Sequence, residues 1–213
     1  MVALVLVNLG GCVGANVAVE PTRLPVPVIE PLPVTLGIHL SDELRNYVHE
    51  EAIKDNGTYR INVGAAQELM FDNLATGLFR GHRFALTPTD HAPNTDAILV
   101  PSINELQFSI PKQTKSDFFE VWLKYNFELF APDGSTIAEW PMQAYGRANS
   151  RNYGFLEDTD NGALQEASRV ALRDAMAVFT FKFQRVPEVQ RWLRGYAAPQ
   201  DSVSQGSTQE RTQ

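Results

Sequence analysis

The chain has 213 residues, a formal net charge of −7 and a hydrophobic fraction of 44%. These values are ordinary for a globular protein, and the length suits one domain with extensions. The acidic balance and the lack of a dense Lys/Arg run argue against nucleic acid as a partner. The single cysteine, Cys12, excludes intramolecular disulfides and any metal site built from several cysteines.

The start of the chain reads as the hydrophobic part of a secretory signal. An apolar run from Val2 to Leu9 is followed by two glycines and Cys12. The run is too short for a membrane-spanning helix, which needs about 20 apolar residues, and small residues are typical of a cleavage site. The first basic residue is Arg23, whereas signal peptides carry a positive n-region. Either the natural start therefore lies upstream, or the resemblance to a signal is accidental. In the second case the run would be a buried N-terminal strand with a core cysteine.

The segment Leu9-Gly10-Gly11-Cys12 resembles the lipobox of bacterial lipoproteins. The resemblance implies that residues 1–11 are removed as a signal peptide and that Cys12 carries diacylglycerol and an amide-linked acyl chain such as palmitate. Two or more acyl chains hold a folded domain stably at a membrane, because each buried methylene contributes about 0.8 kcal/mol. In Gram-negative lipoproteins an Asp after the cysteine favours retention in the inner membrane. Val13 stands there instead, so the resemblance implies a periplasm-facing outer-membrane protein.

The next segment, residues 12–33, is predicted to be a lipid anchor and Pro-rich tether, because its prolines favour extended backbone. Alternating apolar residues then predict a strand from Val34 to Leu40. Ser41 is expected to cap a short helical turn. A second strand is expected over residues 59–63, and apolar residues at four-residue spacing predict a helix from Ala66 to Leu78.

The second half of the chain begins with a short strand expected over residues 83–86. A further strand is expected over residues 97–110, with a bulge or bend near Pro101 and Asn104. The alternation of residues 121–130, the turn at residues 132–134 and a partner strand through residues 140–144 predict a long antiparallel hairpin. A helix is expected after residue 162 and should end near Phe183, and Pro187 begins a last short helix.

This order, β-α-β-β-β-β-α, predicts an α+β fold. We expect a two-layer sandwich in which two main helices pack on one face of a mostly antiparallel sheet. The sandwich should form a single domain over residues 34–194. The polar residues 195–213 are expected to be a disordered tail.

Motifs for catalysis are scarce. The sequence has no Gly-x-Ser-x-Gly elbow, no phosphate-binding glycine loop and no His-Glu-x-x-His motif. Residues 158–162 superficially match a calcium loop but lack its Gly and Glu positions, so a helix-capping loop is the better interpretation. We therefore expect no catalytic residue, cofactor, nucleotide or metal.

Two stretches, residues 145–155 and residues 110–119 in that order, are expected to be loops and carry residue types that favour binding. The first combines arginines with aromatic residues, which are common anchors of protein interfaces. The second contains two adjacent phenylalanines that cannot both point to the same side of a strand. The candidate partner-binding residues are Tyr145, Arg147, Arg151, Tyr153 and Phe155, together with Phe118 and Phe119.

These features favour a non-catalytic, lipid-anchored adaptor or assembly factor that binds another envelope protein or complex. The order of elements and Cys12 resemble small α/β envelope lipoproteins, such as the lipopolysaccharide-assembly lipoprotein and accessory lipoproteins of transporters and secretion systems. One alternative is a hydrolase acting on cell wall or glycan through paired carboxylates among Glu105, Glu120, Glu128 and Glu139. Another is a lipid or ligand carrier, which needs a sizeable apolar cavity.

Overall fold

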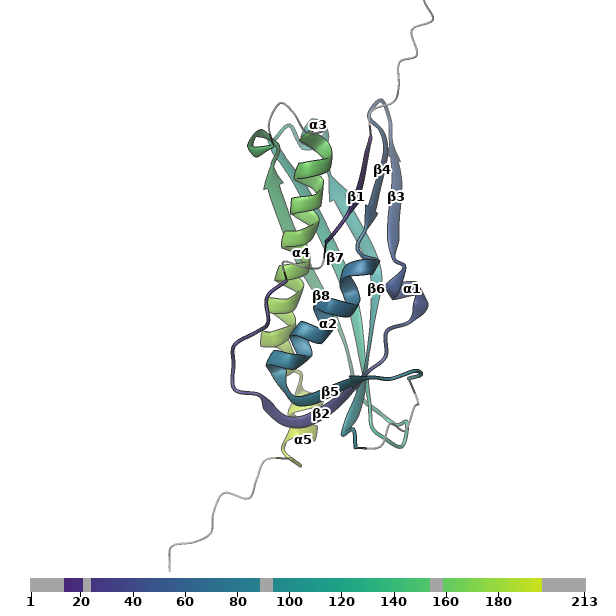
Figure 1. Ribbon diagram of the computed structural model, residues 1–213, viewed down its shortest axis with the longest axis vertical. Helices are drawn as coiled ribbons and strands as arrows, with labels where there is room; N and C mark the ends of the chain where they lie inside the picture. The colour runs from purple at the N-terminus through teal and green to yellow at the C-terminus, as the bar shows by residue number, and fades with distance from the viewer. Residues whose placement is uncertain (1–13, 21–23, 89–93, 154–158, 197–213) are drawn as a thin grey trace, which may run out of the picture.

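The computed structural model describes residues 14–20, 24–88, 94–153 and 159–196, which form one elongated body (Figure 1). Its larger sheet has the strand order β5-β2-β6-β7-β8. β2 runs parallel to both of its neighbours, whereas β6, β7 and β8 are mutually antiparallel. The bounds of these strands are Leu32–Ile38 (β2), Phe79–Phe84 (β5), Ala97–Ser109 (β6), Phe118–Phe130 (β7) and Thr136–Asn149 (β8).

A second, smaller sheet has the order β1-β4-β3, with bounds Ala15–Ala18 (β1), Val48–Ile53 (β3) and Gly57–Asn62 (β4). β1 pairs with β4 in parallel, and β3 and β4 form an antiparallel hairpin. β1 and β3 are not among the predicted strands. The predicted α+β class is confirmed, and the small sheet is an addition to it.

The two main helices, α2 (Gly64–Leu78) and α4 (Thr159–Phe183), lie on the same side of the larger sheet. The shorter helical segments are α1 (Asp42–Arg45), α3 (Pro111–Thr114), η2 (Ser150–Asn152) and α5 (Pro187–Leu193). The predicted cap of α1 is present, because the Ser41 hydroxyl oxygen accepts a hydrogen bond from Leu44 N at 3.2 Å. Within the described ranges, no helix is both long enough and apolar enough to cross a bilayer.

The core lies between α4 and the face of the sheet that β7 and β8 turn toward it. Along β7 the odd-numbered side chains from Phe119 to Leu129 are buried, as the alternation predicts. Small residues let the helix approach the sheet closely. A Cβ added to Gly146 in β8 would lie 2.1 Å from the Ala167 carbonyl oxygen and 2.3 Å from Ala171 N. The predicted irregularity in β6 is also present, as a register shift between Ile103 and Glu105.

The start of α4 differs from the prediction. The helix begins at Thr159, so Asp160 and Asn161 lie in its first turn rather than in a capping loop. Their side chains bind the small sheet. Asp160 Oδ2 accepts a hydrogen bond from the Tyr59 hydroxyl at 3.2 Å, and Asn161 Oδ1 accepts one from Asn16 N at 2.8 Å. These contacts hold the two parts of the fold together.

The segment expected to be a tether is partly built into the fold. Residues Ala15–Ala18 form β1, and Leu24 is only 6% exposed. Gly14 is packed so tightly that an added Cβ would lie 2.0 Å from the Thr58 carbonyl oxygen. Apolar burial against β4 and α4 therefore holds part of the segment that was expected to be a free, extended tether. The signal residues 1–11, Cys12 and residues 197–213 of the expected tail lie outside the described ranges.

Candidate functional site

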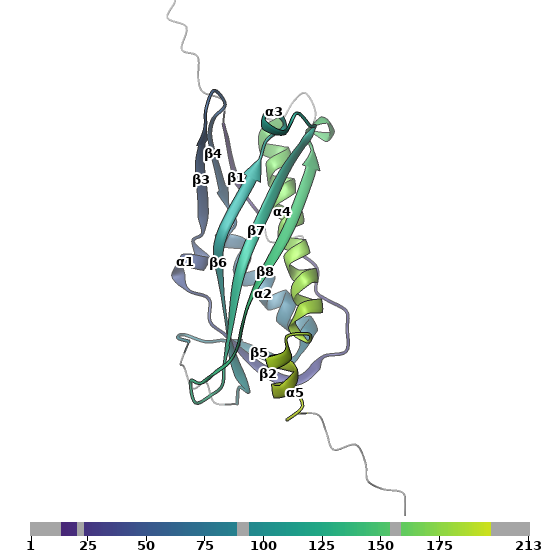
Figure 2. The same cartoon turned by 180° about the vertical axis from the view of Figure 1, so that it is seen from behind.

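The candidate site lies on the face of β6, β7 and β8 opposite α4. Figure 2 shows these strands in front and the helix behind them. Successive residues of a strand point to opposite faces, so the even-numbered residues of β7 lie on this open face. Three of them, Phe118, Trp122 and Phe130, are aromatic and only partly buried, and the first two lie in the first half of the strand.

The β7–β8 register brings the aromatic residues next to a cation. Trp122 lies directly opposite Tyr145, and Glu120 lies opposite Arg147. The Trp122 and Tyr145 ring centres are 5.3 Å apart, and the Arg147 guanidinium carbon lies 4.9 Å from the centre of the Phe118 ring. Cross-strand pairs of this kind are the contacts that fix side chains on a sheet surface.

Glu120 joins this group through two hydrogen bonds. Its carboxylate accepts one from the Tyr145 hydroxyl at 2.5 Å and one from the Ser109 hydroxyl at 3.1 Å. Partial burial, followed by the contact with Glu120, raises the pKa of Tyr145 above its usual range, so the hydroxyl remains a donor. The side chains are therefore held in place before any ligand arrives. We call Phe118, Glu120, Trp122, Tyr145 and Arg147 the aromatic cluster.

A shallow groove of about 570 Å³ adjoins the aromatic cluster. It is lined by residues of β3, β6, β7 and β8, namely Glu51, Gln107, Phe108, Trp122, Lys124 and Gln143. Lys124 Nζ and Gln107 Nε2 each lie 2.5 Å from an oxygen of Glu105. The hydrogen bond from Lys124 holds the pKa of the Glu105 carboxyl below its usual range. The groove can thus accept both apolar and hydrogen-bonding groups.

The structure brings together three of the seven predicted binding residues: Tyr145, Arg147 and Phe118. The two stretches were expected to be loops, but β8 continues to Asn149 and β7 begins at Phe118, so these residues lie on paired strands. The inclusion of Phe119 is wrong, because this side chain is 1% exposed and belongs to the core.

The other three predicted residues lie apart from the cluster or outside the description. Arg151 follows β8 in η2 and pairs with Asp117 at 2.9 Å. Tyr153 lies against α4, where its ring would be 2.8 Å from a Cβ added to Gly162. Burial raises the pKa of Tyr153. Phe155 lies outside the described residues.

Sequence reasoning named Glu120 only as a candidate hydrolase carboxylate, and it missed Trp122 and the groove. A signal for Glu120 and Trp122 was present, because the strand alternation that predicts the core places both on the opposite face. Pairing residues of the two strands outward from the turn at residues 132–134 then places Trp122 near Tyr145. No comparable signal links Glu51 to the groove, because β3 reaches it through the packing of one sheet beside the other.

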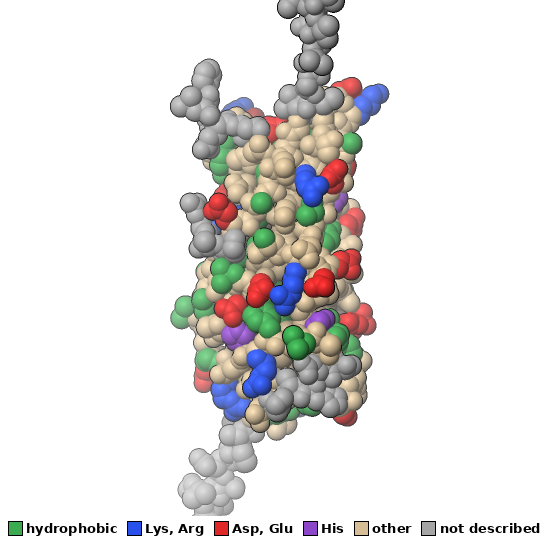
Figure 3. Space-filling model, turned by 45° about the vertical axis from the view of Figure 1, so that its right-hand side comes forward, with side chains coloured by type: hydrophobic (Ala, Val, Ile, Leu, Met, Phe, Trp, Pro, Cys, Tyr) green, Lys and Arg blue, Asp and Glu red, His purple; other side chains and the backbone are tan. Residues whose placement is uncertain are grey.

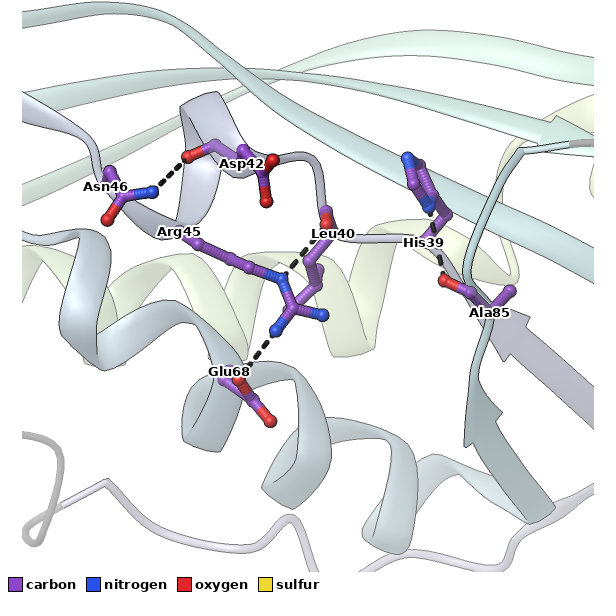
Figure 4. Close-up of polar contacts among 7 residues, drawn as sticks. All are labelled: His39, Leu40, Asp42, Arg45, Asn46, Glu68 and Ala85. Atoms are coloured by element: carbon purple, nitrogen blue, oxygen red, sulfur yellow. Dashed lines mark hydrogen bonds and ion pairs between the residues drawn. The ribbon is translucent and has the colours of Figure 1, made fainter.

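A second polar group surrounds α1 (Figure 4). Arg45 Nε donates to the Leu40 carbonyl at 3.1 Å, and its Nη1 pairs with Glu68 at 2.9 Å. His39 Nδ1 lies 3.2 Å from the Ala85 carbonyl oxygen. These contacts join α1 to α2 and β2 to the end of β5, so we interpret them as structural.

Charge is distributed evenly on the side of the molecule shown in Figure 3, where acidic and basic side chains are interspersed rather than gathered by sign. Within the described part of the chain, no group of three or more His, Cys, Asp or Glu residues could hold a metal ion. The open face with its groove is thus the candidate functional site.

No family model and no curated protein matches the sequence. Solved structures with a similar course of the chain include a Xanthomonas campestris protein of family DUF330, at 11% identity and a TM-score of 0.47, covering 84% of this chain and 96% of that one. A candidate lipoprotein from Caulobacter crescentus CB15 has 11% identity and a TM-score of 0.44, covering 75% of this chain and 90% of that one. The lipoprotein GNA1162 from Neisseria meningitidis has 12% identity and a TM-score of 0.28, covering 66% and 87%.

Two of these neighbours are named as lipoproteins or candidate lipoproteins. Their TM-scores lie below 0.5, so the likeness is limited to the general course of the chain.

Proposed function

We propose that this protein is a non-catalytic, lipid-anchored adaptor of the bacterial cell envelope, and that it binds another envelope protein through the open face of β6, β7 and β8. The finer address is the periplasmic side of the outer membrane. The observation that carries the proposal is the aromatic cluster. A ring pair, a cation over a ring and a doubly hydrogen-bonded carboxylate stand on a face that none of the described helices covers.

Such a cluster has the properties of an interface anchor. Trp, Tyr and Arg are the residue types most often found where truncation costs the most binding free energy. Because Glu120 and the register already fix these side chains, binding loses little of their conformational entropy. The flat face with a shallow groove suits a protein surface better than a small molecule, which usually binds in a deep pocket.

The position of β1 bears on which end of the domain would lie near the bilayer if Cys12 is acylated. β1 begins at Ala15, and Gly14 is already packed against Thr58. Three residues of extended chain span at most about 10 Å. Lipid on Cys12 would therefore keep the end that carries the β3–β4 turn and α3 close to the membrane, with little free spacer (upper end in Figure 1).

The two alternatives have less support from the described residues. A hydrolase needs two acids that act on one bond. Here Glu105 is paired with Lys124, and Glu120 is occupied by two hydroxyl groups. Glu139, directly opposite Glu128, accepts a hydrogen bond from Asn126. A carrier needs an apolar cavity between helix and sheet, whereas Gly146 and Ala167 leave no room there for an added methyl group.

The test is site-specific photocrosslinking in the membrane-anchored full chain. A benzophenone amino acid replaces Trp122, and the matched control carries it at Ala177, an exposed position of α4. We expect a discrete crosslinked partner protein from position 122 only. Trp122→Ala should reduce capture of that partner by roughly 30-fold, the effect of losing about 2 kcal/mol at an interface anchor. Asn126→Ala, on the same face nearer the hairpin turn, should leave capture unchanged.

Equal crosslinking from both positions, or unchanged capture by Trp122→Ala, would contradict the adaptor function. The anchor is tested separately with Cys12→Ser. The substituted protein should leave the membrane fraction, and an unmodified thiol on the native protein by mass spectrometry would remove the lipid from the proposal.

A further inference from the structure

The edge strands of the two sheets differ in whether side chains cap their outward-facing main-chain groups. The strand orders make β1, β3, β5 and β8 edge strands. An open edge presents unpaired main-chain groups, which natural proteins usually cover. Two of the four edges are capped by side chains of α4, whereas β3 borders the groove.

The caps of β1 come from the first turns of α4. Asn161 Oδ1 accepts a hydrogen bond from Asn16 N at 2.8 Å, and Gln165 Nε2 donates one to the Ala18 carbonyl at 2.8 Å. One outward-facing donor and one outward-facing acceptor of β1 are thereby satisfied. Neither group is available to another strand.

The caps of β8 come from farther along the same helix. Asp174 Oδ2 accepts a hydrogen bond from Tyr145 N at 2.9 Å, and Lys182 Nζ donates one to the Pro141 carbonyl at 3.2 Å. Proline itself has no N–H to offer. Two outward-facing groups of β8 are therefore satisfied by α4, in the same way as two groups of β1.

The outward groups of β3 follow from its register with β4. Val63 N donates to the Tyr47 carbonyl at 3.3 Å, so residues 47 and 63 form a hydrogen-bonded pair. Such pairs alternate along an antiparallel ladder. His49, Glu51 and Ile53 then bond to β4, and the N–H and C=O groups of Val48, Glu50 and Ala52 point away from it. No hydrogen bond between these outward groups and another described residue is present.

Across the groove, β6 is paired with β7 on one edge, but its other edge pairs with a described strand only near its start. β2 covers the outer edge of β6 only over Ala97–Leu99. Beyond that point Gln107 and Phe108 of β6 line the groove together with Glu51 of β3. The groove therefore runs beside an open strand edge and reaches Trp122 of the aromatic cluster.

We propose that an extended, basic segment of the partner protein adds as a strand to the outer edge of β3 and places its side chains in the groove beside Trp122. Only an extended polypeptide offers donors and acceptors at the two-residue spacing of Val48, Glu50 and Ala52. Positive charge is favoured because Glu51 lines the groove with about half of its side chain exposed. Glu50, which pairs with Arg60 at 2.8 Å, adds a second partly exposed carboxylate to β3. This inference rests on the proposed function, because it names the class of segment that the adaptor binds.

The probe is a fluorescent nine-residue peptide of alternating Lys and Val with Thr at both ends, titrated into the full chain. Glu50→Pro removes one outward N–H without removing a bond to β4. Glu50→Ala is the matched control, since it loses the same carboxylate and keeps the N–H. We expect Glu50→Pro to bind the peptide at least about tenfold more weakly than Glu50→Ala. A peptide N-methylated at alternate amides and a peptide with Glu in place of Lys should bind neither protein.

Hydrogen exchange on the unmodified protein keeps the test independent of how Glu50→Pro folds. Saturating peptide should slow exchange at the amides of Val48, Glu50 and Ala52 and leave those of Glu51 and Ile53, already bonded to β4, unchanged. Lack of peptide binding, equal binding by both variants, or self-association of the chain through β3 would each overturn the inference. Crosslinking from position 122 would still decide the adaptor function by itself, so the two failures are distinguishable.

Discussion

The close approach of α4 to β8 gives a sharp stability prediction for Gly146→Ala. The added Cβ would lie 2.1 Å from the Ala167 carbonyl oxygen and 2.3 Å from Ala171 N. Both are main-chain atoms, so no change of rotamer relieves the clash, and α4 has to retreat by roughly 1 Å. Overpacking costs about 1–3 kcal/mol, and a backbone clash belongs at the upper end of that range. We expect a loss of about 3 kcal/mol, or about 6–12 °C in Tm for a domain of this size.

The measurement is urea unfolding followed by tryptophan fluorescence, with Gly81→Ala as the control. A Cβ added to Gly81 first meets Thr35 Oγ1 at 3.4 Å, which is ordinary contact. Replacing glycine by alanine where it fits is neutral or stabilises slightly by restricting the unfolded chain. If Gly146→Ala and Gly81→Ala unfold at the same urea concentration, the contact between α4 and β8 is not as the structure describes.

Three further predictions concern other contacts. Tyr125→Phe removes the hydroxyl that donates to buried Gln67 Oε1 at 3.1 Å and should cost about 1–3 kcal/mol in urea unfolding at pH 7. Burial raises the pKa of Tyr125 far above the unfolded value of about 10. The contribution of this hydroxyl to stability is therefore complete below pH 10 and declines as the pH rises further. The free energy of unfolding of Tyr125→Phe should fall less above pH 10 than that of the unsubstituted protein. Glu128 lies directly opposite Glu139, so Glu128→Lys should raise the free energy of urea unfolding by about 0.2–1 kcal/mol in low salt. Less of that gain should remain in 1 M salt, which screens the charges. Asp174→Ala uncaps the edge of β8 and should increase concentration-dependent association measured by light scattering.

Strong periodicity made most of the fold predictable from the sequence. The alternation along β7 and the apolar spacing of α2 dictate which faces are buried, and the structure agrees at both elements. The missed strands lack such a signal. β1 has four residues, of which Ala15 and Ala18 have little preference for strands, and its position depends on β4 and α4. β3 carries Glu50 and Glu51 at its centre and is a strand because the hairpin with β4 pairs it.

The candidate site was harder to predict because it depends on register between strands. Arg147 and Tyr145 were recognised by residue type, but their relation to Phe118 follows from the pairing of β7 with β8. The adjacent phenylalanines illustrate the limit. Alternation requires that one be buried and the other open, yet it does not say which until the register with neighbouring strands is known. Phe119 is the buried one.

The placement of α4 connects the fold to the proposed function. One face of this helix fills the core, while its polar side chains at residues 161, 165, 174 and 182 cap main-chain groups on the edges of β1 and β8. A helix on one side of a sheet can reach only the edges beneath it. The opposite face and the outer edge of β3 are left open together, and the groove joins them. A partner that used both would bury a continuous surface, combining main-chain pairing along β3 with side-chain contacts at the aromatic cluster.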